Sequence, residues 1–481
     1  MDPSRTPTWP IVIPAATPAA APAAPPAPPA PAAPAAPAAA GGPSIALPVR
    51  AEPGGVSARA VFAHPIAPPE ALYIHTPFCA HKCHYCDFYS FVDTRDQQPA
   101  FVERLARELR ALAEHTRAGV SLGGGPRAGG RVPLGSVFVG GGTPSLLAPR
   151  LWERLLVAIH EHFDLTAPGG VPAEFTVECN PESATPELLR LLRGGGVNRV
   201  SMGAQSFHAA HLRTLERIHT PGRVGRAVAD ARAAGIERVS IDLIYAVPGQ
   251  SPQDWRADLE RALSLSLDHL SCYNLTYEPN TAMTVRLARG EFVPAPEDDE
   301  LAMFDLAEEL LTAAGLTRYE VSNYARGGIH GPHACRHNLA YWRQGGWLAA
   351  GPSASGHLRV RGGAAPSGVR WKNAPRLDTY LSRDDGGLAP VCDLEPPDPA
   401  RALRERLMTG LRLSEGVDAL AAAADAEAAA PGSAARLRHC AQELVSDGLL
   451  GVHGQRWALT RRGWPLADFV ARRMMSRVGE P

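Results

Sequence analysis

Three cysteines lie close together in the first fifth of the chain, and their spacing is the first sign of chemistry. Cys79, Cys83 and Cys86 stand four and three positions apart within the stretch YIHTPFCAHKCHYCDFYS. This spacing lets three thiolates surround one metal centre. A zinc site needs a fourth ligand, whereas an iron–sulfur cluster held by three cysteines leaves one iron open to a substrate or cofactor.

Nearby histidines keep the zinc alternative open. His75, His81 and His84 flank the cysteines, and any of them could supply a fourth zinc ligand. A third interpretation is a buried structural trio, but His and Lys neighbours are poor material for a core. Eight cysteines in 481 residues are too few for a disulfide framework, so clustered thiols favour metal chemistry in a reducing compartment.

Composition narrows the class of protein. The chain has 481 residues, enough for two or three domains, and a formal net charge of −1. This balance supplies no basic field for nucleic acid or anionic lipid. No apolar run approaches the roughly 18 residues of a membrane-spanning helix. We therefore expect a cytoplasmic protein without a membrane span or a nucleic-acid partner.

The N-terminal segment has a composition of its own. Residues 15–41 are almost wholly Ala and Pro. Frequent proline removes backbone donors and interrupts helices, and neither residue type supplies much apolar bulk to bury. The composition predicts a disordered, Ala/Pro-rich tail over residues 1–68.

After the tail, short apolar runs alternate with amphipathic segments. Several of these segments open with Ser-Pro or Thr-Pro, a good pair for a helix N-terminus. Six strand–helix units predict an α/β fold with a parallel sheet, in the form of a partial TIM-like (β/α) barrel. The predicted strands are 71–76, 136–142, 174–181, 198–206, 238–249 and 269–279.

Polar residues follow nearly every predicted strand. Gly141, Gly142 and Thr143 end the second strand, and Glu178, Gln205 and Asp242 lie at or near the ends of the next three. Each alone is more often structural than functional. Together they would share the rim on which the cysteine loop lies, because the C-terminal strand ends of such barrels build the active site.

These motifs resemble a known family. The pattern CxxxCx(aromatic)C after the first strand is similar to that of radical S-adenosylmethionine (SAM) proteins, in the branch of the oxygen-independent coproporphyrinogen III oxidases and the HemW-type heme chaperones. The resemblance implies a 4Fe–4S cluster on the three cysteines, SAM on the open iron, and an external electron donor for SAM cleavage. By the same resemblance, SAM would contact Tyr73, Gly141, Gly142, Thr143, Glu178, Gln205, Arg217 and Asp242. Glu216 could pair with Arg217, which weakens that one assignment.

Two further segments separate the branches. The oxidases usually carry another cysteine two positions after the third, where this chain has Phe88. The segment CRHNLAYW resembles the HNxxYW segment of the chaperones, which would place His337, Asn338 and Tyr341 on the substrate side. His337 could ligate heme iron, although a histidine hydrogen-bonded within the fold is the more ordinary interpretation.

The resemblance thus predicts a heme chaperone that binds heme and transfers it to an acceptor protein, whose identity the sequence does not give and for which a respiratory protein is one candidate. The alternatives are an oxygen-independent coproporphyrinogen III oxidase and a non-catalytic zinc-binding protein. The expected domains are the barrel over 69–325, a connecting and substrate-side segment over 326–398, and a small winged-helix-like module over 399–481.

Overall fold

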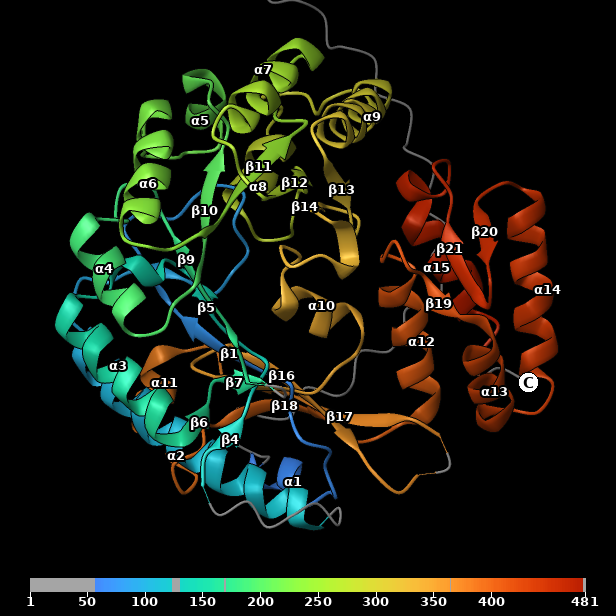
Figure 1. Cartoon of the computed structure of the whole chain (residues 1–481), viewed down its shortest axis with the longest axis horizontal. Helices are drawn as coiled ribbons and strands as arrows, with labels where there is room; N and C mark the ends of the chain where they lie inside the picture. Colours follow the sequence, from blue (N-terminus) through green and yellow to red (C-terminus); the bar gives the residue numbers. More distant parts are fainter. Residues whose placement is uncertain (1–56, 123–129, 168–169, 364, 479–481) are drawn as a thin grey trace, which may run out of the picture. The chain divides into compact units, whose positions relative to one another are not determined.

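A computed structural model describes residues 57–122, 130–167, 170–363 and 365–478 (Figure 1). The predicted tail, except for its last residues, lies outside these ranges. Among the helices of the described ranges, none combines the length and apolar character that a membrane crossing requires.

Six neighbouring parallel strands form the centre of a twelve-stranded sheet, in chain order (Figure 1). They are β1 (Ala71–Thr76), β5 (Ser136–Gly141), β9 (Glu174–Cys179), β10 (Arg199–Gln205), β11 (Arg238–Tyr245) and β12 (His269–Asn274). The two outer strands of this set pair with other strands rather than with each other, so the barrel stays open. The predicted α/β partial barrel is confirmed.

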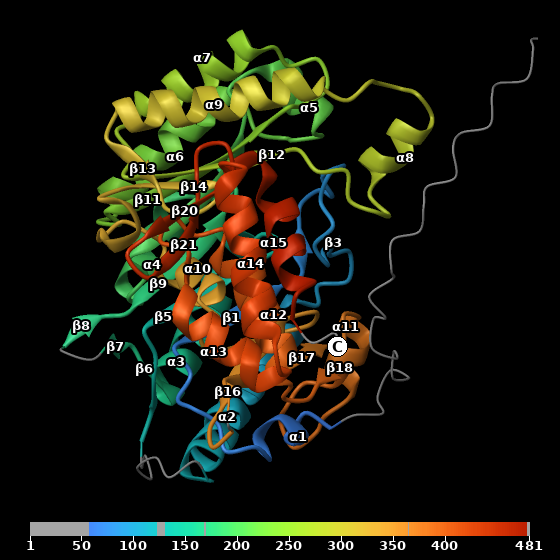
Figure 2. The same cartoon turned by 90° about the vertical axis from the view of Figure 1, so that its right-hand side faces the viewer.

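Helices follow the parallel strands, and those other than α8 cover the outer face of the strands (Figures 1 and 2). They are α2 (Gln98–Leu122), α3 (Pro149–His162), α4 (Pro186–Gly194), α5 (Ala209–Thr214), α6 (Pro221–Ala233), α7 (Pro252–Leu263), α8 (Ala282–Ala288) and α9 (Glu297–Ala313). Two of the predicted caps are present: the Thr185 side chain accepts from the Leu188 amide, and Ser251 with Asp254 forms a capping box. Thr220, which precedes Pro221 at the start of α6, makes no side-chain cap bond.

Short elements complete the barrel region. They are β2 (Phe78–Cys79), β3 (Phe91–Val92), β4 (Val132–Pro133), η1 (Pro144–Leu146), β6 (Phe163–Asp164), β7 (Thr166–Ala167), β8 (Val171–Pro172), β13 (Leu316–Arg318), β14 (Asn323–Arg326) and η2 (Gly328–His330). Of these, β14 runs antiparallel to β12 and β13 antiparallel to β14, which extends the sheet at that edge.

The segment 326–398 is more than the predicted connection. It contains α10 (Arg336–Trp342), β15 (Trp347–Ala350), β16 (Ser355–Val360), β17 (Ser367–Asn373), α11 (Leu377–Ser382) and β18 (Val391–Glu395). Strand β15 pairs in parallel with β1, and the next three strands follow it antiparallel. The sequence signal was weak because charged side chains interrupt these short strands, as Lys372 does in β17.

A buried carboxylate ties this added sheet to the barrel. Glu108 of α2 accepts hydrogen bonds from Tyr380 Oη at 2.6 Å, the Gly351 amide at 3.0 Å and Asn373 Nδ2 at 3.1 Å. Burial raises the pKa of Glu108, while Arg104 and these hydrogen bonds oppose the shift. Glu108 therefore joins α2 to the end of β17 and to α11.

The folded region also begins earlier than the predicted boundary after residue 68. Helix α1 (Arg59–Phe62) buries Val61 and Phe62, and Ile66 is fully buried. Ile66 bridges to Val360 of β16. These apolar side chains have partners only in distant segments, so composition alone assigned them to the tail.

The C-terminal module has a separate core. Its elements are α12 (Pro399–Gly410), β19 (Val417–Asp418), α13 (Ala419–Ala429), α14 (Ser433–Ser446), β20 (Leu450–His453), β21 (Arg456–Leu459), η3 (Trp464–Leu466) and α15 (Ala467–Met475). The strands form a small antiparallel sheet in the order β19-β21-β20. Leu407, Leu437, Trp457 and Met474 pack in its core. The structure thus has helices and a small antiparallel sheet where the sequence predicts a small winged-helix-like module.

Candidate functional site

The cysteine loop follows β1 at the carboxyl end of the parallel strands. Its ends are held together because β2 pairs with β3, and the Cys86 amide donates to the Cys83 carbonyl at 3.3 Å. Cys79, Cys83 and Cys86 are free and half-buried, and all three line a cavity of about 530 Å³, here called the cysteine cavity. The structure therefore brings the predicted trio together on one wall.

The flanking histidines differ in their availability. His75 donates from Nε2 to the Tyr89 carbonyl at 2.8 Å and accepts at Nδ1 from Tyr73 Oη at 3.0 Å, so both ring nitrogens are occupied. His84 contacts Arg286 through Nδ1 at 3.1 Å. Of these three histidines, only His81 lines the cysteine cavity. If one of these histidines were the fourth zinc ligand, it would be His81.

The Gly-Gly-Thr turn after β5 forms another part of the wall. A Cβ on Gly141 would lie 2.5 Å from the His75 ring, and one on Gly142 would lie 2.6 Å from the Phe78 carbonyl oxygen. The glycines are thus required for the turn to pack against the cysteine loop. Thr143 Oγ1 lies 3.6 Å from Cys79 Sγ, which links the turn directly to the trio.

Two partly buried carboxylates face the cysteine cavity. Desolvation, followed by the charge of Asp242, raises the pKa of Glu178 to about 8, and burial raises the pKa of Asp242. Glu178 accepts from the Gly141 amide at 3.1 Å, and Asp242 accepts from Ser201 Oγ at 3.3 Å. A cationic ligand in the cavity would favour the ionised form of both groups.

Gln205 and Arg217 also line the cysteine cavity. A bulge between Gly203 and Gln205 turns the end of β10, and Gln205 has a positive φ of 62°. Arg217 donates to the Gly203 carbonyl at 2.7 Å and lies 3.4 Å from Cys83 Sγ, while its buried Nε has no hydrogen-bond partner among the described residues. Glu216 lies 3.7 Å from His81 Nε2, and within the described ranges no ion pair joins Glu216 to Arg217.

A second cavity of about 570 Å³ adjoins the first, and we call it the aromatic cavity. Tyr73 lines this cavity and not the cysteine cavity, beside His337, Asn338 and Tyr341. The His337 ring stacks on Phe138 with centroids 5.1 Å apart. The predicted substrate-side residues therefore share a single wall with Tyr73.

The two ring nitrogens of His337 have different surroundings. Nδ1 contacts Ser136 Oγ at 3.1 Å, whereas the buried Nε2 has no hydrogen-bond partner in the described residues. Burial lowers the pKa of His337 to about 3, so the imidazole is neutral at physiological pH. A neutral imidazole with one held nitrogen and one free nitrogen can serve as a ligand.

Sequence reasoning missed the residues beneath both cavities. Arg199, 3% exposed, lines the aromatic cavity and lowers the pKa of both Glu178 and Asp242 by its charge. Ser201 lines both cavities. The sequence did hold one signal for Arg199, which is the first residue of the otherwise buried strand β10. Burying a charge is costly unless the charge is paired.

Two protein-family models match parts of the chain. The model of the radical SAM superfamily matches residues 73–262, and that of the HemN C-terminal domain matches residues 398–466. The heme chaperone HemW of Mycobacterium tuberculosis is 38% identical over 408 residues, which cover 85% of this chain and 95% of that protein. The heme chaperone HemW of Lactococcus lactis is 34% identical, with 73% and 83% covered.

The chain belongs to the HemW family of radical SAM proteins. Membership implies a 4Fe–4S cluster and SAM as cofactors. A solved structure of the coproporphyrinogen III oxidase HemN of Escherichia coli has the same fold, with a TM-score of 0.69 and 23% identity, over 87% of this chain and 93% of that one. The family's shared fold thus includes both the open barrel and the C-terminal module.

Proposed function

We propose that this HemW-family chain is a heme chaperone that holds a 4Fe–4S cluster and SAM in the cysteine cavity. Cys79, Cys83 and Cys86 would ligate the cluster. The proposed SAM contacts are Gly141, Gly142, Thr143, Glu178, Gln205, Arg217 and Asp242, with Tyr73 behind Glu178. When bound, this cofactor pair supplies one-electron reductive cleavage of a carbon–sulfur bond, and an external donor supplies the electron.

One observation carries the cofactor assignment: two desolvated carboxylates face the same cavity as three free thiols. The sulfonium and ammonium groups of SAM are cations, and they would stabilise Glu178 and Asp242 in ionised form. The unpartnered Nε of Arg217 can donate to a carboxylate such as that of SAM. The donor set therefore fits a molecule with both kinds of charge.

For the cargo, we propose the aromatic cavity as the heme side. Its volume falls within the roughly 300–1,000 Å³ typical of cofactor sites, and Tyr73, His337, Tyr341 and Trp347 give it an aromatic lining. The names of the curated relatives favour heme as the cargo. The acceptor would be another protein, with respiratory proteins as the candidates to test, and transfer would take place in the cytoplasm.

A coproporphyrinogen III oxidase is the second candidate, favoured by the fold shared with HemN. Phe88 argues against it, because the oxidases usually have a cysteine at this position. The Phe88 side chain is 58% exposed on the rim of the cysteine cavity.

Heme titration into anaerobic, cluster-loaded protein tests the proposal, with and without SAM. We expect stoichiometric heme binding without turnover, and weaker binding in His337→Ala than in His330→Ala, a change at a histidine outside the aromatic cavity. Coproporphyrinogen III is then supplied with SAM and a reductant. Formation of protoporphyrinogen would overturn the chaperone proposal in favour of the oxidase.

A further inference from the structure

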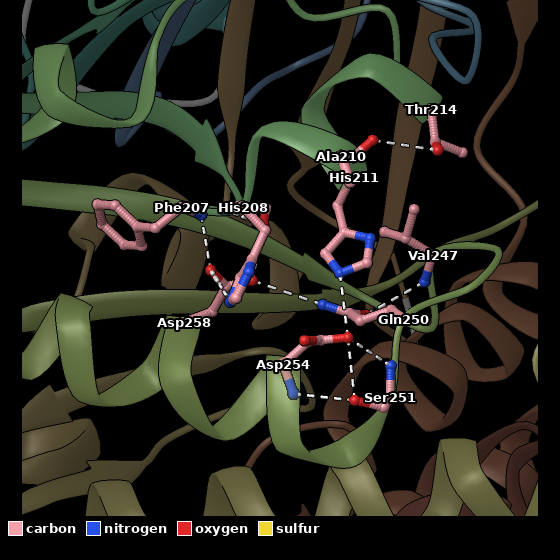
Figure 3. Close-up of polar contacts among 11 residues, drawn as sticks. Phe207, His208, Ala210, His211, Thr214, Val247, Gln250, Ser251, Asp254 and Asp258 are labelled. Atoms are coloured by element: carbon pink, nitrogen blue, oxygen red, sulfur yellow. Dashed lines mark hydrogen bonds and ion pairs between the residues drawn. The ribbon is translucent and has the colours of Figure 1, made fainter.

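A second cluster of metal-ligating side chains lies outside both cavities, between α5 and α7 (Figure 3). His208 caps the start of α5, His211 lies one turn later, and Asp254 lies in the first turn of α7. One ligand atom from each side chain lies within 4.8 Å of the others. Among the described residues, no other group of three or more metal-ligating side chains is so arranged.

The central contact already has the spacing of two ligands of one ion. His211 Nε2 and Asp254 Oδ2 are 3.4 Å apart. This is longer than an ordinary N–H···O hydrogen bond of about 2.7–3.2 Å. It matches the separation of about 3.3 Å between tetrahedral ligands that lie roughly 2.0–2.1 Å from zinc. His211 is buried, so this half of the site is held in place by packing.

Hydrogen bonds from Ser251 hold the Asp254 carboxylate in place. Asp254 Oδ2 accepts from the Ser251 amide at 3.0 Å and from Ser251 Oγ at 2.9 Å, and these bonds lower the pKa of Asp254. Metal-ligating carboxylates are commonly held by such outer partners. The Asp254 carboxylate is therefore held toward the His211 imidazole, as Figure 3 shows.

A second carboxylate lies beside the three side chains. Asp258 has no exposed side-chain surface, and it accepts from Ser206 Oγ at 2.8 Å and the Phe207 amide at 2.6 Å. The ion pairs of Asp254 and Asp258 within the described ranges are with His211 and His208. A cation held by His208, His211 and Asp254 would therefore lie close to a second carboxylate.

We propose that His208, His211 and Asp254 bind a divalent transition-metal ion, with Zn²⁺ as the best match. Two imidazoles and one carboxylate suit zinc by ligand type, and water would complete the coordination. His208 is partly exposed, with 35% of its side-chain surface accessible, so the ion can enter and this ring can turn toward it.

The ion would fasten a segment that serves the cysteine cavity. Helix α5 lies between Gln205 and Arg217, which both line that cavity. A cation shared by α5 and α7 would restrain this segment from outside. The site is distinct from the cysteine trio in ligands and in place, so zinc here does not compete with the proposed cluster.

Zinc titration of the full-length, cluster-loaded protein tests the site. Zn²⁺ is added anaerobically against a chromophoric chelator, and iron is measured in the same samples to show that the cysteines remain occupied. We expect one tightly held equivalent of zinc. Loss of a direct ligand should weaken binding by more than the roughly 10- to 100-fold that loss of an outer partner costs.

His208→Asn and His211→Asn test the ligands, and His439→Asn is the matched control because His439 is an exposed histidine of α14. Zinc should raise the melting temperature of the wild type and the control, but not of His208→Asn. Melting without metal verifies that each variant folds. A wild type that retains no zinc, or a folded His208→Asn that binds as tightly as the wild type, overturns the proposal.

Discussion

Glu178→Gln gives the sharpest test of how the cysteine cavity recognises SAM. With a pKa of about 8 in the ligand-free protein, the carboxylate is ionised in only about a tenth of molecules at pH 7. A cationic ligand favours the ionised form. The affinity of the wild type for SAM should therefore rise from pH 6.5 upward and level off above pH 8.

The magnitude follows from the contact that the charge would make. A hydrogen bond to a charged group contributes about 1.5–3 kcal/mol, which corresponds to roughly 10- to 100-fold in affinity. The Gln variant has the size of protonated Glu178 but cannot ionise. Its dissociation constant should be close to that of the wild type at pH 6.5 and at least about tenfold higher near pH 9.

Anaerobic calorimetry on cluster-loaded protein measures both dissociation constants across this pH range. The ionisations of SAM itself affect both proteins equally, so they cancel in the ratio of the two constants. Glu182→Gln is the matched control, because Glu182 lines the same cavity but is 43% exposed. A variant-to-wild-type ratio that stays constant with pH would refute the reasoning.

Three further experiments test the cluster ligands, the N-terminal boundary of the fold and the hydrogen bonds of Glu108. Cys83→Ala should abolish iron loading and SAM cleavage together, whereas the control Cys392→Ala should retain both. Iron analysis measures the loading, and chromatography of the products measures SAM cleavage. A Cys83→Ala protein that still held its iron would disprove the ligand assignment. Deleting residues 2–56 should leave iron loading and the melting temperature unchanged. Deleting residues 2–68 should lower the melting temperature, because it removes the buried side chains of Phe62 and Ile66. The burial of each contributes about 1.5–3 kcal/mol to the free energy of unfolding. Tyr380→Phe removes a hydrogen bond to buried Glu108 and should lower the free energy of unfolding by about 1–3 kcal/mol, measured with urea; no change would exclude a stabilising role for this bond.

The six parallel strands were predictable because strands buried on both faces read as apolar runs, and their helices begin with local Ser-Pro or Thr-Pro caps. Strand β15 was not predictable, because its partner is distant: Ala71 pairs with Trp347. The same limit applies to the site. The predicted strand ends placed Glu178 and Asp242 at the site. The cavity that Tyr73 faces depends on the direction of its side chain and on the position of α10, and no local sequence pattern encodes either.

The two cavities share a wall, and this has a consequence for any protein that uses both. Glu178, Ser201 and Asp242 line the cysteine cavity and the aromatic cavity alike. A cation bound on the cysteine side would ionise Glu178 and thereby change the electrostatic field on the side of Tyr73 and His337. Binding free energies are coupled reciprocally, so a ligand in the aromatic cavity must alter the affinity for SAM by the same factor. Since Glu178 is the group with the raised pKa, the coupling should be strongest below pH 8 and should be lost in Glu178→Gln. Coupling that persisted unchanged in this variant would have to pass through Asp242 or through the backbone instead.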